Sequence, residues 1–232
     1  MSRDIYTSLS GAVATWTELE VAANNIANSS TTAFKADRVP FRVAGPNDET
    51  MGSIYTMADA TVADFTDGDL MVDNNPFHLA LQGRGFFTVT DGTRVLLSRD
   101  GSFQLDNEGR MVNRQGMTLL GDAGPVAIPA GHTPKIAQDG RVFDGDNQPI
   151  NRIVLVDVNN VSRVGSNMWT ANEPVVPSGA FINQGSLERS NVDPMRAMVE
   201  LVEVSRYFEA YQKAMQTSDE LDSRINRIGG RS

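Results

Sequence analysis

The chain has 232 residues, of which 40% are hydrophobic and 21% are charged, so it can form one large domain or two small ones with a buried core. Its formal net charge of -9 at pH 7 argues against nucleic acid and anionic lipid as partners. The absence of cysteine excludes disulfides and thiolate metal sites, and the two histidines are too few for a His-rich site. We therefore expect no cofactor and no bound metal.

The first residues, Met1 to Ile5, show no basic stretch followed by an apolar run, so we expect no cleaved secretory signal. No segment approaches the ~18 consecutive apolar residues that a transmembrane helix needs. We expect a chain that does not insert into a membrane.

A helical pattern covers residues 4 to 28. Apolar residues recur there at alternating spacings of four and three and form a narrow line, which we call the predicted seam: Ile5, Leu9, Ala12, Trp16, Leu19, Ala23 and Ile26. A seam of this width is typical of helices that pair as in a coiled coil.

Polar residues end this helix and continue beyond it: Asn24, Asn25, Asn28, Thr31 and Thr32. One interpretation is fraying, because Asn, Ser and Thr compete for backbone hydrogen bonds. The other is a polar interface with a neighbouring subunit, because amides donate and accept hydrogen bonds without the desolvation cost of a charge. Both interpretations remain open at this point.

The middle of the chain is rich in turn signals. Five Asp-Gly pairs begin at Asp67, Asp91, Asp100, Asp139 and Asp144, and short alternating runs such as Phe86 to Thr90 flank them. Asp-Gly between alternating runs is a strong hairpin signal. The pattern predicts a central antiparallel β-domain in which some of these pairs are loop ends.

A second helical pattern follows Asp193 and Pro194, which suit the N-cap and the first helical position, and it ends at Gly229-Gly230. Its predicted seam comprises Val204, Tyr207, Tyr211, Ala214, Leu221, Ile225 and Ile228, with the polar Ser218 interrupting it. A second stripe, Met198, Leu201, Phe208 and Met215, is apolar in the first half of the helix only. The first half therefore has two apolar faces.

These patterns predict an α+β fold. Long N- and C-terminal helices form an α-helical, coiled-coil-like domain, and the β-domain lies between them in the sequence. The expected boundaries are 1–42 for the first helix and the loop after it, 43–74 for an extended connection, 75–184 for the β-domain and 185–232 for the last helix.

The sequence offers little catalytic chemistry. It contains neither a Gly-x-Ser-x-Gly elbow nor a P-loop. Asp144-Gly145-Asp146-Asn147 resembles the start of a calcium loop, but the twelfth position is Leu155 and not glutamate, so a hairpin turn is favoured. His78 and His132 read as surface, capping or loop residues. We expect no catalytic residues; a β-rich secreted hydrolase or binding protein is the alternative, and a hydrolase would need paired carboxylates in a cleft.

Three blocks of the sequence resemble the bacterial flagellar rod and hook family. The first is Asn24 to Asn28 with Thr31-Thr32-Ala33-Phe34-Lys35. The second runs from Gln82-Gly83-Arg84-Gly85-Phe86-Phe87 through Ser98-Arg99-Asp100-Gly101-Ser102-Phe103 to Leu119-Leu120-Gly121. The third is Gln184 to Val192 with the helix after it. Within the family, Ile5-Tyr6-Thr7 with Ser10-Gly11-Ala12 is most similar to the proximal-rod members, while distal-rod and short hook-type members are alternatives.

The resemblance implies a structural subunit of the basal-body rod. Such a chain is exported by the flagellar type III apparatus without a cleaved signal. It assembles in the periplasm with other rod subunits, through its terminal helices, into a helical tube that transmits torque. Two positions depart from the family pattern, namely Ala33 in place of glycine and His78 in place of aspartate. With alanine at position 33, we expect a turn there that needs no positive φ.

Overall fold

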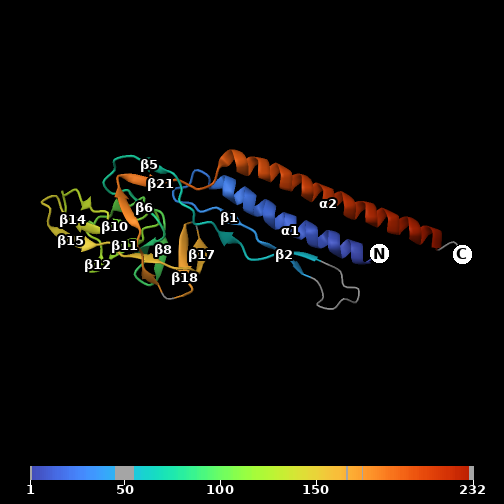
Figure 1. The fold of residues 1–232 in the computed structure, drawn as a ribbon, viewed down its shortest axis with the longest axis horizontal. Helices are drawn as coiled ribbons and strands as arrows, with labels where there is room; N and C mark the ends of the chain where they lie inside the picture. Colours follow the sequence, from blue (N-terminus) through green and yellow to red (C-terminus); the bar gives the residue numbers. More distant parts are fainter. Residues whose placement is uncertain (1, 45–54, 166, 174, 230–232) are drawn as a thin grey trace. The chain divides into compact units, whose positions relative to one another are not determined.

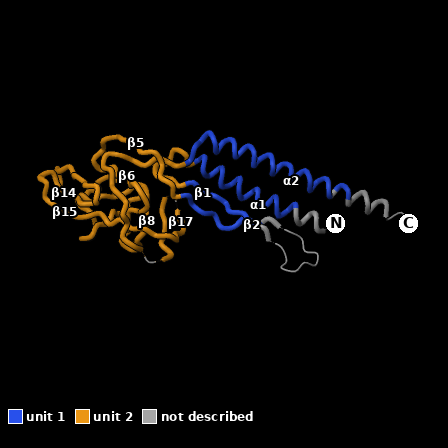
Figure 2. The backbone as a smooth tube through the Cα atoms, in the orientation of Figure 1, with its two compact units in different colours: residues 1–27, 36–64, 192–232 blue, residues 28–35, 65–191 orange. Residues whose placement is uncertain are grey.

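The computed structural model describes residues 2–44, 55–165, 167–173 and 175–229 (Figure 1). The chain divides into two compact units (Figure 2). The first unit comprises residues 1–27, 36–64 and 192–232, and the second comprises residues 28–35 and 65–191. The chain therefore passes from one unit to the other at 27/28, 35/36, 64/65 and 191/192.

The first unit contains both helices, α1 (Ser2–Ala27) and α2 (Pro194–Gly229). They run antiparallel, and α1 also packs against a strand of this unit, β3. The strands of this unit form two antiparallel pairs, β1 (Asp37–Arg38) with β4 (Val62–Ala63) and β2 (Phe41–Ala44) with β3 (Tyr55–Ala58). Asp193 caps α2 by accepting the backbone N–H of Met195 at 2.9 Å. Within the described ranges, neither helix is long and apolar enough to cross a membrane.

The second unit is built on an antiparallel sheet with the strand order β17-β18-β8-β7-β11-β10-β9. Strand β16 joins it beside β7 and carries β19, and β12 pairs with β11. Smaller sheets are β13-β14-β15, β20-β6 and β21-β5. The bounds are β5 (Leu70–Val72), β6 (Leu79–Gln82), β7 (Phe86–Thr90), β8 (Val95–Ser98), β9 (Gln104–Leu105), β10 (Met111–Val112), β11 (Thr118–Gly121), β12 (Gly124–Pro125), β13 (Lys135–Ile136), β14 (Arg141–Phe143), β15 (Pro149–Arg152), β16 (Leu155–Asp157), β17 (Val161–Gly165), β18 (Met168–Ala171), β19 (Val176–Pro177), β20 (Phe181–Gln184) and β21 (Ser186–Glu188).

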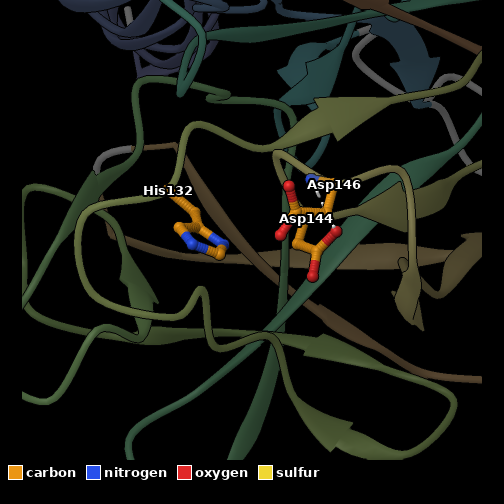
Figure 3. Close-up of side chains that lie close together, drawn as sticks. All are labelled: His132, Asp144 and Asp146. Carbon is orange, nitrogen blue, oxygen red and sulfur yellow. Dashed lines mark hydrogen bonds between the residues drawn. The ribbon is translucent and has the colours of Figure 1, made fainter.

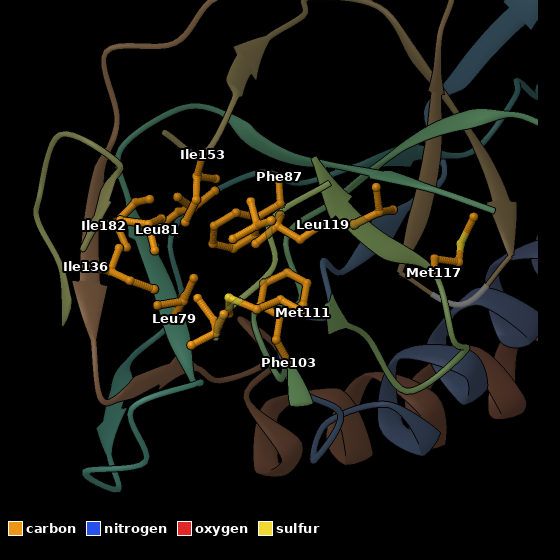
Figure 4. Close-up of a cluster of buried hydrophobic side chains, with 14 of the residues drawn as sticks. Leu79, Leu81, Phe87, Phe103, Met111, Met117, Leu119, Ile136, Ile153 and Ile182 are labelled. Carbon is orange, nitrogen blue, oxygen red and sulfur yellow. The ribbon is translucent and has the colours of Figure 1, made fainter. Parts of the chain in front are cut away.

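The hydrophobic core of this unit lies between its sheets (Figure 4). Phe87, Met111 and Leu119 are fully buried in it. Phe87 and Phe103 meet edge to face, with ring centroids 5.4 Å apart. The alternating runs of the sequence supply these inward side chains, because successive residues of a strand point to opposite faces.

The predicted fold class, α+β with an α-helical, coiled-coil-like domain, is wrong. The described part of the chain is mostly β-structure with two helices, and those helices do not form a domain of their own. They share their unit with β1 to β4, and α1 packs against β3 as well as α2. The short runs Phe41–Ala44 and Tyr55–Ala58 pair as strands, and the second of them packs against α1, although we expected residues 43–74 to be an extended connection.

The units also divide the chain differently from the expected boundaries. Residues 28–35, expected with the first helix, belong to the second unit, as do residues 185–191 at the start of the expected last segment. The expected connection 43–74 contributes β3 and β4 to the first unit and β5 to the second; its residues 45–54 lie outside the described residues.

The Asp-Gly pairs fall into two groups. Those at Asp91, Asp139 and Asp144 lie in turns between consecutive antiparallel strands. Those at Asp67 and Asp100 do not connect hairpin strands: Asp67 pairs with an arginine, and Asp100 is buried. The sequence pattern alone does not separate these groups, because Asp-Gly suits a turn and a close backbone approach equally well.

The expectation that residue 33 needs no positive φ is wrong. Ala33 has φ of 53° and is 2% exposed. Its N–H donates to the Glu188 carbonyl oxygen at 2.8 Å, and the next N–H, of Phe34, donates to Thr31. The surrounding hydrogen bonds thus hold an alanine in a backbone region that glycine adopts more readily.

We predict that Ala33→Val lowers the free energy of unfolding by about 2 kcal/mol, because a β-branched side chain is strained at positive φ. Ala33→Gly should stay within about 1 kcal/mol of the wild type, since relief of strain offsets the loss of a buried methyl group. Urea unfolding followed by tryptophan fluorescence measures both. Equal stability of the valine and glycine variants would contradict the backbone geometry.

Candidate assembly surfaces and a buried ion cluster

On α1, Gly11 and Trp16 contact α2. Gly11, Ala14 and Ala22 are buried, and a Cβ at Gly11 would lie 2.7 Å from the ring of Tyr211. Glycine at position 11 therefore allows the tyrosine ring to lie against the α1 backbone. Beside this contact, Trp16 and Phe208 have ring centroids 5.3 Å apart.

On α2, Ala197, Leu201, Val204 and Phe208 line one side of the helix, and Phe208 contacts Trp16 of α1. Ala197 and Val204 are buried, and the other two are half-buried. Their spacings of four, three and four place them on one side of the helix. Leu201 and Phe208 belong to the second stripe noted in the sequence, and only Val204 comes from the predicted seam.

The predicted seam is only partly buried within the chain. Ala12 and Val204 are buried, and Leu19 and Ile26 are half-buried. The exposed members are Leu9, Trp16, Ala23, Tyr207, Tyr211, Ala214 and Leu221. The side chains of Ile5, Ile225 and Ile228 lie outside what the structure describes. Two of the exposed members still contact the other helix, Trp16 at Phe208 and Tyr211 at Gly11.

The exposed apolar residues form one stripe on each helix. On α1 they are Leu9, Val13 and Trp16, which we call the α1 stripe. On the first turns of α2 they are Met195, Met198, Val199 and Val202, which we call the α2 stripe. Apolar residues at helical spacing on a solvent-facing side are typical of surfaces that another chain covers.

The predicted polar interface residues make contacts inside the chain. Asn25 forms two hydrogen bonds with the backbone of Asp37, donating from Nδ2 at 2.8 Å and accepting at Oδ1 from its N–H at 2.9 Å. Thr31 donates to Asn28 at 3.2 Å, and the Thr32 carbonyl accepts from Asn167 at 2.6 Å. Asn24 also interacts with another group of the chain. A role for these residues toward a neighbouring subunit stays a prediction, and Asn25 has both polar atoms in use.

Within the second unit, four charged side chains form a cluster, which we call the ion cluster: Lys35, Asp67, Arg99 and Glu188. Lys35, Arg99 and Glu188 have side chains no more than 3% exposed, whereas Asp67 is 45% exposed. Lys35 Nζ lies 2.6 Å from Glu188 Oε1, and Arg99 Nε lies 3.3 Å from Glu188 Oε2. Arg99 Nη2 lies 2.6 Å from Asp67 Oδ1. Two cations and two anions thus compensate one another.

Backbone groups add further hydrogen bonds to the cluster, although Arg99 Nε and Glu188 Oε2 face each other without a hydrogen bond. Lys35 Nζ donates to the Thr66 carbonyl at 2.6 Å, and Arg99 Nη1 donates to the carbonyls of Gly83 and Gly85 at 2.7 and 2.9 Å. Gly68 N donates to Glu188 Oε1 at 2.9 Å, and a Cβ at Gly68 would lie 2.1 Å from the Arg189 carbonyl oxygen. The glycines of this region therefore allow backbone to approach the buried charges.

Burial lowers the pKa of Lys35, and the charge of Arg99 acts in the same direction. Glu188 and Asp67 oppose the shift. A buried ammonium group costs free energy unless its partner is present. The stability of the cluster therefore depends on Glu188, which faces both cations.

Further contacts hold the segment that leads to Lys35. The Asn191 N–H donates to the Phe34 carbonyl at 3.3 Å. Arg163 donates to the Lys35 carbonyl at 3.0 Å, and its guanidinium lies 5.0 Å from the ring centroid of Phe34 and 4.4 Å from that of Trp169. Residues 33–35 are thus fixed within the second unit.

The sequence analysis assigned no role to Lys35, Arg99 or Glu188 individually. Charged residues are mostly exposed, and the three lie 64 and 89 residues apart in the chain (99 − 35 and 188 − 99). The only available signal was their position in the three blocks that resemble one family, with one of them in each block.

His132, Asp144 and Asp146 bring their ligand atoms within 4.8 Å of one another (Figure 3). Asp144 Oδ1 accepts the N–H groups of Asp146 at 3.0 Å and of Gln148 at 2.8 Å in the turn between β14 and β15. This turn has its positive φ at Asn147. Hydrogen bonding within the turn therefore explains the approach of the two aspartates.

A groove of about 540 Å³ lies in the second unit beside β16 and β19 and contains Asp122 and Asp139. Burial raises the pKa of Asp139, but hydrogen bonds and charge from Arg141 outweigh it, and the net pKa is lowered. A hydrolase with two carboxylates needs one with a raised pKa as its acid. The pKa of Asp139 is lowered instead, which does not suit the role of the acid.

We predict that Glu188→Gln lowers the free energy of unfolding of the second unit by about 3–5 kcal/mol, because two buried cations then lack a facing anion. Urea unfolding of a Trp16→Phe background measures this through Trp169, the remaining tryptophan. Glu173→Gln, at an exposed glutamate, is the matched control and should change stability by about 0.5 kcal/mol or less. A loss below about 1 kcal/mol for Glu188→Gln would contradict the role of the cluster.

A second prediction concerns Glu18, whose pKa is raised by partial burial and by Glu200. Above the ordinary glutamate pKa of 4.5, the folded state therefore keeps more protons on Glu18 than the unfolded chain does. As the pH rises from this value, the contribution of Glu18 lowers the free energy of unfolding progressively. Glu18→Gln should stabilise the helices at pH 7 by about 0.5 kcal/mol or less, and not at pH 3.5. Thermal unfolding followed by helical circular dichroism tests this; equal gains at both pH values would speak against it.

Comparison with known proteins gives matches to three family models. "Flagella basal body rod protein" matches residues 5–35, "Flagellar hook protein FlgE/F/G D1 domain" matches residues 80–143, and "Flagellar basal body rod FlgEFG protein C-terminal" matches residues 183–228. Each matched segment contributes one buried member of the ion cluster: Lys35, Arg99 and Glu188.

Relatives match over their full length. The chain is 33% identical over 245 residues to the flagellar basal-body rod protein FlgF of Caulobacter vibrioides, covering 99% of each chain. It is 32% identical to FlgF of Salmonella typhimurium over 98% of each, and 29% identical to FlgG of Bacillus subtilis over 95% of this chain and 97% of the relative. The chain therefore belongs to the flagellar basal-body rod protein family, close to its FlgF members, and is a structural subunit of the basal body that assembles with other rod proteins.

Proposed function

We propose that this chain builds the proximal part of the rod, where α1 and α2 join neighbouring subunits in a helical tube that transmits torque across the periplasm. The observation that supports this most directly is the pair of exposed apolar stripes. The α1 stripe and the α2 stripe lie on helices that already pack against each other, so burial of the stripes requires other chains.

Two different stripes suit a helical array. A subunit in such an array contacts its neighbours through unlike surfaces, so that the contact repeats without closing into a ring of two. Stiffness under torque then depends on many packed side chains, since each buried apolar side chain contributes about 1.5–3 kcal/mol.

We also infer export through the flagellar type III apparatus without signal cleavage. The helix α1 occupies Ser2–Ala27 and packs against α2. Export without cleavage keeps the helix pair intact.

The experiment is deletion of the gene followed by electron microscopy of isolated basal bodies. For a proximal subunit, we expect basal bodies with an incomplete proximal rod and without distal rod and hook. Basal bodies with an intact proximal rod that lack only distal segments would favour the distal-rod or hook-type alternative and contradict the proposal.

Complementation of the deletion strain gives a residue-level prediction. Leu9→Asp should reduce the amount of the chain in purified basal bodies at least tenfold, because a carboxylate in a packed apolar contact costs several kcal/mol. Gln216→Asp, at an exposed α2 position outside the stripes, is the control and should incorporate normally. Immunoblots of basal bodies measure both, and normal incorporation of Leu9→Asp would count against assembly through this surface.

A further inference from the structure

In the second unit, a histidine from one loop lies beside two aspartates from another. His132 belongs to the segment between β12 and β13, and Asp144 and Asp146 belong to the turn between β14 and β15. Hydrogen bonds within the turn place the two aspartates, but these bonds do not involve His132. A Cβ at Gly145 would lie 3.9 Å from Cβ and Cγ of His132. The histidine side chain therefore packs against the turn at the residue between the two aspartates, as Figure 3 shows.

The imidazole of His132 has a nitrogen that no described protein group binds. Its Nδ1 atom is buried and has no hydrogen-bond partner among the described residues. Such a nitrogen is unusual, because buried polar atoms in folded proteins are nearly always bound. A neutral imidazole nitrogen offers a lone pair, and ionised carboxylates also only accept. A cation is the ligand that a histidine and two carboxylates can bind together.

The charges of this turn are arranged differently from those of comparable turns. In three other hairpin turns of the second unit, an aspartate also accepts a backbone N–H, and an arginine of the same turn binds its Oδ2: Arg94 at Asp91, Arg110 at Asp106 and Arg141 at Asp139. After Asp144, the corresponding positions hold Asp146, Asn147 and Gln148. This turn therefore brings two carboxylates and an imidazole together where the other turns use an arginine.

We propose that His132, Asp144 and Asp146 bind a divalent cation of the zinc class. The proposal goes beyond the rod function and does not rest on it. One imidazole nitrogen and two carboxylate oxygens form a donor set that suits Zn²⁺, and water completes the coordination. Calcium fits less well, because it takes roughly six to eight oxygen ligands. The twelfth position of this loop is Leu155, which offers no side-chain oxygen.

The distances are compatible with such an ion. Zinc binds histidine and carboxylate atoms at roughly 2.0–2.2 Å, which places the atoms of a tetrahedral set about 3.4 Å from one another. The ligand atoms of the three side chains already lie within 4.8 Å of one another. Asp146 is exposed, so its carboxylate can rotate toward the ion without disturbing the core.

The sequence analysis expected no bound metal, because cysteine is absent and two histidines are too few for a His-rich site. The proposed site needs one histidine, and the fold brings that histidine to the turn. A bound cation joins the loop before β13 to the hairpin of β14 and β15 and offsets the repulsion between Asp144 and Asp146. Since it binds the folded unit, it raises the unfolding temperature of that unit.

Calorimetric titration of the untagged full chain with ZnCl₂, after removal of metal by a chelator, tests the proposal. We expect one Zn²⁺ per chain. His132→Ala and Asp146→Asn should each weaken the binding at least about tenfold, because each removes one of three protein ligands. The matched controls are His78→Gln, at the other histidine, and Asp69→Asn, at an exposed aspartate outside the site. Both controls should bind Zn²⁺ as the wild type does.

NMR of the imidazole groups locates the ion. The chain has two histidines, so the spectrum contains two sets of ring signals. Zn²⁺ should shift the signals of His132 and leave those of His78 unchanged, while Ca²⁺ at the same concentration should shift neither. The same spectra show whether the variants are folded.

The proposal is overturned if the chain does not bind Zn²⁺, or if His132→Ala and Asp146→Asn bind it as tightly as the wild type. A shift at His78 alone, or an equal shift of His132 with Ca²⁺, would also overturn it. None of these results bears on the rod function. That function fails separately, if deletion of the gene leaves the proximal rod complete.

Discussion

The buried contact between Lys35, Glu188 and Arg99 is the constraint on which the organisation of the second unit depends. These residues come from segments far apart in the chain, and each charge is compensated only when all three segments are in place. Because an unpaired buried charge costs several kcal/mol, the cluster favours one arrangement of the three segments. It thereby determines where residues 33–35 lie within the β-structure, close to the Glu188 carbonyl and to Asn191.

The helix pair of the first unit follows a different principle. At Gly11 the lack of a side chain allows the Tyr211 ring to approach the α1 backbone, while Leu9, Val13 and Met195 remain exposed. In a single chain, the apolar side chains of these helices are therefore only partly buried. We propose that neighbouring rod subunits cover these residues, since exposed apolar stripes are typical of surfaces that another chain covers.

Local patterns in the sequence were sufficient for some elements and not for others. The spacing of apolar residues was enough to predict both helices. The Asp-Gly pairs were enough to predict the turns at Asp91, Asp139 and Asp144. The contact of Gly11 with Tyr211 could not be predicted, because the period of apolar residues identifies large side chains and not a glycine. The pairing of Lys35 with Glu188, and the use of Asp67 in an ion pair, depend on tertiary contacts that no local spacing encodes.

Hydrogen exchange at the Ala33 amide tests the central claim most directly, since its N–H donates to the Glu188 carbonyl beside the ion cluster. The Met111 amide, bonded to Val126 in the core of the same unit, is the reference. If the cluster fixes residues 33–35 in the second unit, both amides exchange only when that unit unfolds, at similar rates. Exchange at Ala33 near the rate of an unstructured peptide, with Met111 protected, would contradict the account.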